Sequence, residues 1–146
     1  MSVAMPAHRD SAFFRAALAS VLQQTLTDLE VIVGDDSGGS LHDAVVAAAD
    51  PRVRYIPHAQ RLGFVDNHIA TLDLARGDYL AILHDDDRWQ PDYLERLVGE
   101  LQADPELGLA CSDLWEVFDD GTRRRPGEWI AEGPPHDWGG RAITHN

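Results

Sequence analysis

The chain has 146 residues, a length typical of one compact domain with its own hydrophobic core. Its 25 acidic residues outnumber the 12 basic ones, and the formal charge of −13 argues against nucleic acid as a partner. No apolar run approaches the roughly 20 residues of a membrane span, and the N-terminus lacks a signal-peptide pattern. Cys111 is the only cysteine, so we expect no disulfide framework and a cytoplasmic setting, with peripheral attachment to the inner face of a membrane as the alternative.

Short apolar runs alternate with stretches of helical spacing along most of the chain, which predicts an α/β sandwich with a largely parallel sheet. The first strand is expected to stop at Pro6, and Asp10 or Ser11 is expected to cap the first helix. In chain order we expect a strand over 2–5, a helix over 11–24, a strand over 29–33, a helix over 41–49, a strand over 53–56, a helix over 64–75, a strand over 79–83, a helix over 92–103 and a strand over 107–112.

The pattern changes after about residue 113. Residues 114–118 favour a strand, 119–121 a hairpin turn, and the basic run 123–125 follows. The tail over 127–146 is rich in Gly, Pro, Trp and His without a clear period, so it is expected to be a functional loop or part of a longer structure.

Three consecutive carboxylates, Asp85, Asp86 and Asp87, follow the apolar strand expected over 79–83. Like charges repel, and no fold needs three of them at one strand end for stability. A divalent cation relieves the repulsion, because Mg²⁺ and Mn²⁺ suit hard oxygen ligands, and Mg²⁺ leaves positions open for substrate phosphates. The cluster therefore indicates metal-bridged binding of a phosphorylated ligand. The structural alternative is a polar turn before a helix opened by Pro91.

A second acidic pair, Asp35 and Asp36, follows the strand expected over 29–33. The carboxyl ends of parallel strands lie along one edge of the sheet, so both acidic loops can share one cleft. One carboxylate can accept a hydrogen bond from a base N–H while the other cluster holds a metal and a diphosphate. The loop over 37–40 can bring backbone N–H groups to a ligand, or it can be a plain turn.

Several blocks of sequence together resemble the nucleotide-binding half of a family 2 glycosyltransferase, whose fold is called GT-A. They occur in the family's order over about residues 2 to 117. The family's IPTYNR loop corresponds to MPAHR over 5–9, the end of its LxxALxSVLxQT helix to ASVLQQT over 19–25, ELIVVDDGS to LEVIVGDDS over 29–37, NxGxxxARN to RLGFVDN over 61–67, and AxGxYIxxLDxDDxWxP to the stretch 75–91 with its LHDDDRWQP ending.

The resemblance implies a nucleotide-sugar-binding α/β domain over 1–113 and the start of an acceptor-side region over 114–146, truncated or loop-like. It also implies roles for single residues. Pro6, Ala7 and His8 would line the base pocket, Asp35 or Asp36 would bond the base edge, Arg61 would lie near the base or diphosphate, Asp85 would hold the ribose, and Asp86 with its neighbour Asp87 would hold Mg²⁺ or Mn²⁺. His84 stands where the family often has the first Asp of its triplet, and it is expected either to bond a phosphate or ribose or to be an ordinary polar residue.

The implied activity is metal-dependent, inverting transfer of a sugar from a nucleoside diphosphate sugar to a hydroxyl of a sugar, lipid-linked or protein acceptor. Family catalytic domains are usually longer, and their general base lies further along, so Asp113 and Asp137 are only weak candidates for it. A partner chain or a homo-oligomer would then supply the acceptor side. The alternative is a non-catalytic nucleotide-sugar-binding or assembly module of the same fold.

Overall fold

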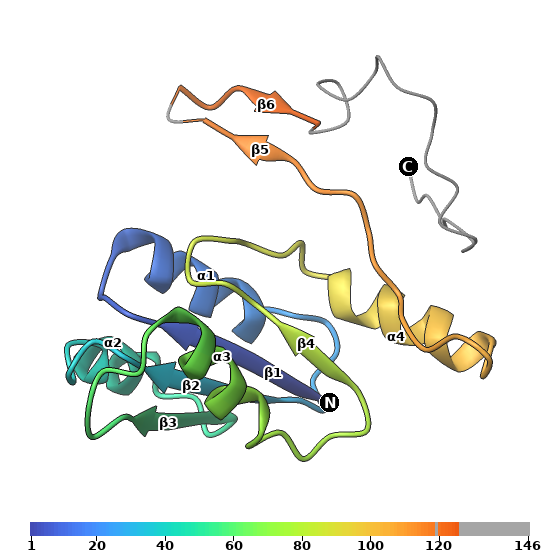
Figure 1. Cartoon of the computed structure of the whole chain (residues 1–146). Helices are drawn as coiled ribbons and strands as arrows, with labels where there is room; N and C mark the ends of the chain where they lie inside the picture. The colour runs from blue at the N-terminus through green and yellow to red at the C-terminus, as the bar shows by residue number, and fades with distance from the viewer. Residues whose placement is uncertain (119, 126–146) are drawn as a thin grey trace. The chain divides into compact units, whose positions relative to one another are not determined.

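A computed structural model describes residues 1–118 and 120–125, which fall into two compact units divided after Gly99 (Figure 1). The alternation of strands and helices that the sequence predicts is confirmed through the fourth helix. The elements are β1 (Ser2–Ala7), α1 (Ala12–Leu22), β2 (Glu30–Asp35), α2 (His42–Ala48), β3 (Val53–Pro57), α3 (Phe64–Leu72), β4 (Leu80–Ile82), α4 (Tyr93–Ala103), β5 (Glu116–Val117) and β6 (Arg123–Arg124).

The first unit is built on a four-stranded sheet with the order β3-β2-β1-β4. Every pair in this sheet is parallel, and the register places Ser2 of β1 opposite both Glu30 of β2 and Leu80 of β4. All four strands therefore end on the same edge. The loops that carry the two acidic clusters leave the sheet along this carboxyl edge.

The two faces of the sheet are covered by different helices. Side chains alternate along a strand, and odd-numbered residues of β1 and β2 pack in one core with α1, α2 and the first turn of α4. On the opposite face, α3 crosses in front of β1 and β2 in Figure 1. Ser11 caps α1 as predicted, because its side chain accepts a hydrogen bond from the backbone N–H of Phe14 at 3.0 Å.

The expectation that Pro6 ends the first strand was wrong, since β1 runs to Ala7. Even-numbered residues of β1 bond toward β4, as Ser2 N does to Tyr79 O and Leu83 N does to Ala4 O. Pro6 lies on that side, beyond Ala4, where pairing with β4 ends. The missing N–H of proline therefore breaks no ladder hydrogen bond.

The strand expected over 107–112 was also wrong, because the structure assigns no strand to these residues. Among the described residues, their one backbone hydrogen bond outside regular elements is a turn from Leu107 N to Asp104 O. A hydrophobic run becomes a strand only when its backbone groups find a ladder to pair with. The helix expected over 64–75 is shorter than predicted, since α3 ends at Leu72.

The predicted hairpin after residue 113 is confirmed in the second unit, where β5 and β6 are antiparallel. Gly121 takes a φ of 81°, a left-handed conformation that suits glycine at a tight turn. The guanidinium groups of Arg124 and Arg125 lie 5.3 and 4.9 Å from the ring centres of Phe118 and Trp115. Part of the basic run thus stacks on aromatic rings within its own hairpin.

Candidate functional site

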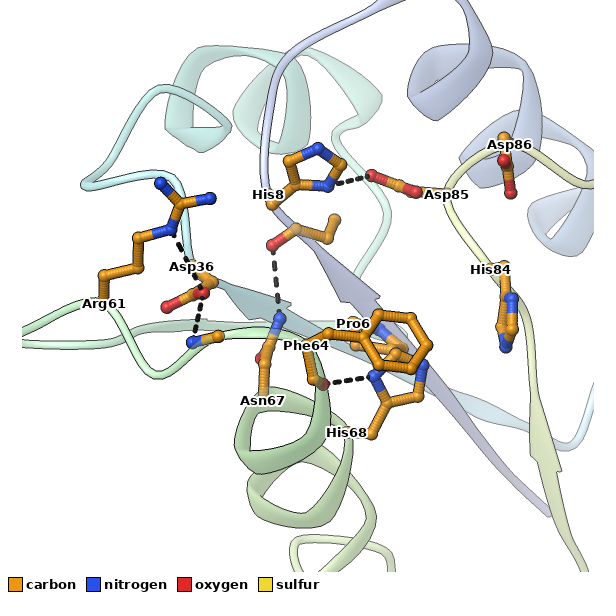
Figure 2. Close-up of a pocket in the computed structure, with 12 residues that line it drawn as sticks. Pro6, His8, Asp36, Arg61, Phe64, Asn67, His68, His84, Asp85 and Asp86 are labelled. Carbon is orange, nitrogen blue, oxygen red and sulfur yellow. Dashed lines mark hydrogen bonds and ion pairs between the residues drawn. The ribbon is translucent and has the colours of Figure 1, made fainter.

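A cleft of about 360 Å³ opens at the carboxyl edge of the sheet, within the first unit (Figure 2). Its volume is in the range of small-molecule sites. A smaller hollow of about 250 Å³ beside it shares His8, Asp36 and Arg61. The residues lining the main cleft come from the ends of β1 and β2, the start of α3 with the loop before it, and the loop after β4: Pro6, Ala7, His8, Asp36, Arg61, Gly63, Phe64, Asn67, His68, His84, Asp85 and Asp86.

Asp36 holds the wall of the cleft that precedes α3. It is buried, and its two carboxylate oxygens accept hydrogen bonds from the backbone N–H groups of Leu62 at 2.5 Å and Gly63 at 2.9 Å. The Arg61 side chain is 78% exposed, and its Nε lies 3.9 Å from the same carboxylate. A carboxylate offers about four lone-pair positions, so Asp36 keeps capacity for a ligand N–H.

Asp35 lies beneath the cleft and is not among the residues that line it. Its oxygens accept hydrogen bonds from Ser37 N at 2.6 Å and Tyr55 Oη at 2.5 Å. Burial alone would raise the pKa of Asp35, but these bonds outweigh it and the pKa is lowered. Burial and the Asp35 carboxylate together raise the pKa of Tyr55 to about 12. The Asp35 carboxylate thus takes part in shaping the loop after β2.

Asn67 joins the strands beneath the cleft to α3. Its side-chain N–H group donates to the carbonyl oxygens of Ala7 at 3.3 Å and Gly34 at 3.2 Å, and its oxygen lies 2.8 Å from Nε2 of His58. Gly34 permits this close packing, because a Cβ there would lie 1.9 Å from Oγ1 of Thr71. The packing beneath the cleft is therefore tight, and the side-chain amide of Asn67 is paired on both its nitrogen and its oxygen.

The three carboxylates after β4 have different surroundings. Asp85 is part-buried, and its carboxylate lies 3.3 Å from Nδ1 of His8. Asp86 and Asp87 are exposed, and among the described residues their side chains make no hydrogen bond or ion pair. The sequence could not distinguish the three, because the difference depends on where β1 brings His8.

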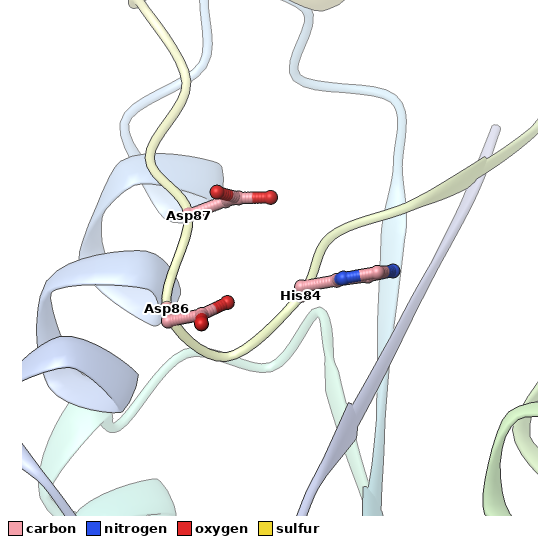
Figure 3. Close-up of side chains that lie close together, drawn as sticks. All are labelled: His84, Asp86 and Asp87. Carbon is pink, nitrogen blue, oxygen red and sulfur yellow. The ribbon is translucent and has the colours of Figure 1, made fainter. Parts of the chain in front are cut away.

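His84, Asp86 and Asp87 gather on one side of the loop after β4 (Figure 3). One potential ligand atom from each lies within 4.8 Å of the others, and all three side chains are exposed. Two carboxylates and an imidazole with free coordination positions form a donor set that suits Mn²⁺ and, through its carboxylates, Mg²⁺. The chemistry of these residues thus fits the ion that the sequence led us to expect.

Phe64, Asn67 and His68 line the cleft but were not among the site residues predicted from the sequence. Phe64 is 73% exposed, and its ring centre lies 4.2 Å from that of His68. The two residues sit at positions 1 and 5 of α3, so helical spacing places them on the same side. An exposed aromatic residue at the start of a helix beside a binding loop was the available signal.

The structure gathers most of the predicted site residues and leaves others apart. The predicted site residues that line the main cleft are Pro6, Ala7, His8, Asp36, Arg61, Asp85 and Asp86. Asp87 belongs to the cluster with His84 and Asp86, whereas Asp35 lies beneath the cleft. Asp113 is exposed in the second unit, and Asp137 lies outside the described residues, so both stay predictions for the general base. None of the helices among the described residues has the length and apolar character to cross a membrane.

Residues 2–142 match the sequence family described as Glycosyl transferase family 2. The chain is 36% identical over 117 residues to the chondroitin synthase of Escherichia coli, covering 76% of this chain and 16% of that protein. It is 38% identical over 110 residues to the succinoglycan biosynthesis protein ExoO of Rhizobium meliloti, covering 75% of this chain and 31% of that protein. The chain spans between 14% and 40% of the length of the curated relatives it matches.

Solved structures also share the fold. The mannosyltransferase PcManGT of Pyrobaculum calidifontis, in complex with GDP-Man and Mn²⁺, is 26% identical, covers 73% of this chain and 33% of its own, and superimposes with a TM-score of 0.64. TarS of S. aureus is 19% identical, covers 70% of this chain and 19% of its own, and has a TM-score of 0.62, which supports the fold alone. These neighbours confirm the expected GT-A architecture.

Proposed function

Because this chain belongs to glycosyl transferase family 2, we propose that its carboxyl-edge cleft binds a nucleoside diphosphate sugar with Mg²⁺ or Mn²⁺. The sugar then passes to a hydroxyl of a sugar, lipid-linked or protein acceptor. One observation carries the proposal: Asp36 and Arg61 at one side of the cleft and the cluster His84, Asp86 and Asp87 at the other lie at the same sheet edge. A nucleoside diphosphate needs hydrogen-bonding groups for its base and a cation-binding cluster for its phosphates within one site.

The base would lie toward the smaller hollow that His8, Asp36 and Arg61 share with the main cleft. Asp36 retains acceptor capacity for a base N–H, and Pro6 and Ala7 present apolar surface beside it. The exposed Arg61 guanidinium can swing onto the diphosphate, because its contact with Asp36 is long at 3.9 Å. Asp85, held by His8, faces the same space and would accept from the ribose.

Asp86, Asp87 and His84 would hold the ion. When bound, Mg²⁺ or Mn²⁺ neutralises negative charge on the diphosphate that leaves. The complex of PcManGT with GDP-Man and Mn²⁺ supports this class of donor and ion. Asp86 and Asp87 make no ion pair within the described residues, so no internal contact needs to break when the ion binds.

Transfer would proceed with inversion. A general base takes the proton of the acceptor hydroxyl, and the oxygen attacks the anomeric carbon opposite the departing diphosphate. Asp113 and Asp137 remain candidates for that base. Eight curated relatives are longer than this chain, which spans at most 40% of their length, so in this proposal the acceptor side comes from outside the chain. In the alternative function, a binding or assembly module, donor binding persists without turnover.

Calorimetry on the purified chain tests the donor site. We expect one of UDP, GDP and dTDP to bind, and to bind at least about 100-fold more weakly when Mn²⁺ is omitted or when Asp86→Ala is used. Asp78→Asn is the matched control, because Asp78 is exposed and lies before β4, at the opposite end of that strand from the cluster. It should bind like the unaltered chain.

Absence of nucleotide binding in every condition would contradict the donor site. If binding is confirmed, turnover of the matching nucleotide sugar with added acceptors distinguishes an enzyme from a binding module. Release of nucleoside diphosphate only when acceptor is present supports transfer. Binding without release supports the module.

A further inference from the structure

His68 lines the cleft, and one of its ring nitrogens has no hydrogen-bond partner among the described residues. Its Nδ1 lies 2.7 Å from the backbone carbonyl oxygen of Phe64, one turn earlier in α3. A carbonyl oxygen can only accept, so Nδ1 carries the proton in this contact. In the neutral imidazole, Nε2 is then an acceptor with a free lone pair.

This Nε2 atom is buried and has no hydrogen-bond partner, the one such side-chain atom among residues 1–118 and 120–125. The neighbouring polar side chains of α3, in contrast, have hydrogen-bond partners. Asn67 bonds to Ala7, Gly34 and His58, and Thr71 donates to the Asn67 carbonyl oxygen at 2.7 Å. A buried polar atom without a partner carries a desolvation cost, so a ligand that donates to it gains an interaction the fold lacks.

The surroundings of His68 indicate the chemistry of that ligand. Phe64 is 73% exposed, and its ring centre lies 4.2 Å from that of His68; the ring centre of His84 lies 5.3 Å from that of His68 on another side (Figure 2). Aromatic faces pack against the apolar C–H groups of a ring, and a bare acceptor beside them suits a hydroxyl. A hydroxylated sugar ring has both groups.

We propose that Nε2 of His68 accepts a hydrogen bond from a hydroxyl group of the bound nucleotide sugar, with the sugar ring packed against Phe64. The hydroxyl belongs either to the ribose or to the transferred sugar, which present the same chemistry. The inference rests on the proposed function, because it names a specificity contact within the same cleft. His68 is assigned binding, not proton transfer.

Two substitutions test the contact by calorimetry, with UDP, UDP-GlcNAc, GDP and GDP-Man as probes in the presence of Mn²⁺. His68→Phe keeps a ring beside Phe64 but has no acceptor, and we expect about a tenfold loss of affinity, as for one hydrogen bond. His68→Gln keeps an acceptor and should lose much less. His42→Phe is the matched control, since His42 lies in α2 outside the cleft lining and should leave affinity unchanged.

The choice of probe identifies the hydroxyl. If His68→Phe weakens the binding of UDP and UDP-GlcNAc (or of GDP and GDP-Man) equally, the ribose donates the hydrogen bond. A 2′-deoxy or 3′-deoxy nucleotide then shows which ribose hydroxyl is involved: the analogue that lacks it binds His68→Phe and the unaltered chain equally. If only the nucleotide sugar is weakened, the transferred sugar donates. A merely structural role would weaken every probe, deoxy analogues included, and would lower the melting temperature of His68→Phe.

Three outcomes would overturn the inference. One is equal affinity of His68→Phe and the unaltered chain for every probe, which leaves the proposed function intact. Another is the structural pattern just described. Failure of the unaltered chain to bind any probe would contradict the proposed function itself, and the inference with it. Nitrogen chemical shifts of the His68 ring add an independent check, because the Nε2 signal should shift when the ligand binds and the signal of Nδ1, which is already bonded to the Phe64 carbonyl, should shift less.

Discussion

The two ends of the central sheet treat their polar groups in opposite ways. At the amino end, the half-buried Glu30 lies between neighbours that use both of its oxygens: Ser2 Oγ donates at 2.7 Å, Arg54 Nη1 at 2.6 Å and the backbone N–H of Arg76 at 3.0 Å. At the carboxyl end, the side chains of Asp86 and Asp87 are exposed and unpaired within the described residues. Only the first arrangement can contribute to stability.

This difference separates groups that hold the fold from groups that await a ligand. The same distinction applies inside the carboxyl end, where Asp36 ties down the loop before α3 while Nε2 of His68 has no partner among the described residues. A polar group the fold uses has its partners in the chain. One without them is stabilised when a ligand binds.

The packed layer under the cleft is expected to be the most sensitive to substitution. Gly34→Ala places a Cβ 1.9 Å from Oγ1 of Thr71 and 2.8 Å from Oδ1 of Asn67. We expect α3 to be pushed from β2, at a cost of about 3 kcal/mol in the free energy of unfolding. Urea denaturation measures it. Gly99→Ala is the matched control, because no atom lies within 4 Å of a Cβ there, and it should not destabilise. Equal stability of the two variants would contradict the packing described.

The amino end comes next in expected effect. Glu30→Gln keeps the size of the side chain but removes its charge beside Arg54, whose Nη1 also donates to the Leu74 carbonyl. We expect a loss of about 2 kcal/mol, because hydrogen bonds to charged groups are among the stronger ones. Chemical denaturation at neutral pH measures the loss. A change below about 0.5 kcal/mol would show that this network does not hold the fold.

The Glu30 network also predicts a pH dependence. Burial opposes the charge of Glu30, but hydrogen bonds from Ser2, Arg54 and Arg76 outweigh it and lower the pKa below its ordinary value of 4.5. A carboxyl group whose pKa is lower in the folded state contributes stability above its unfolded-state pKa and loses it as the pH falls through the folded-state value. The difference in stability between the native chain and Glu30→Gln should therefore be complete at neutral pH and shrink below about pH 4.5. A pH-independent difference would contradict this account.

The rim of the carboxyl end should show the smallest effect on stability. Asp86→Asn and Asp87→Asn remove repelling charges and break no contact, so the free energy of unfolding without metal should stay within about 0.5 kcal/mol or rise slightly. Thermal denaturation in a chelator measures this. A loss comparable to that of Glu30→Gln would show that the rim carboxylates hold the fold and would erase the contrast between the two ends.

Strand and helix positions followed from periodicity wherever an element buries a face. The apolar runs of β1 and β2 and the spacing of Phe14, Leu18 and Val21 in α1 are examples. The two strand predictions that were wrong depended on whether a neighbouring strand was present to pair with. Pro6 is tolerated in β1 because β4 ends beside it, and 107–112 forms no strand although its composition suits one. Local sequence shows neither where β4 ends beside Pro6 nor whether residues 107–112 have a strand to pair with.

Site residues that belong to a sequence motif could be predicted, whereas those placed by tertiary packing could not. The acidic loops after β2 and β4 were recognisable, and the parallel sheet brings them to one edge. The separate roles of Asp35 and Asp36 depend on Tyr55 and the Leu62 N–H, which are distant in sequence. The place of His68 in the cleft likewise depends on how α3 crosses the sheet.

Paramagnetic broadening by Mn²⁺ tests the contrast between the two ends most directly. Backbone amide signals are recorded with substoichiometric Mn²⁺, alone and with UDP or GDP. We predict broadening centred on residues 84–87 that extends to 36 and 61–63, with the weakest effect at 28–30 and 52–54 at the amino end. Broadening centred elsewhere, or equal at both ends of the sheet, would contradict the assignment of the unpaired carboxylates to an ion.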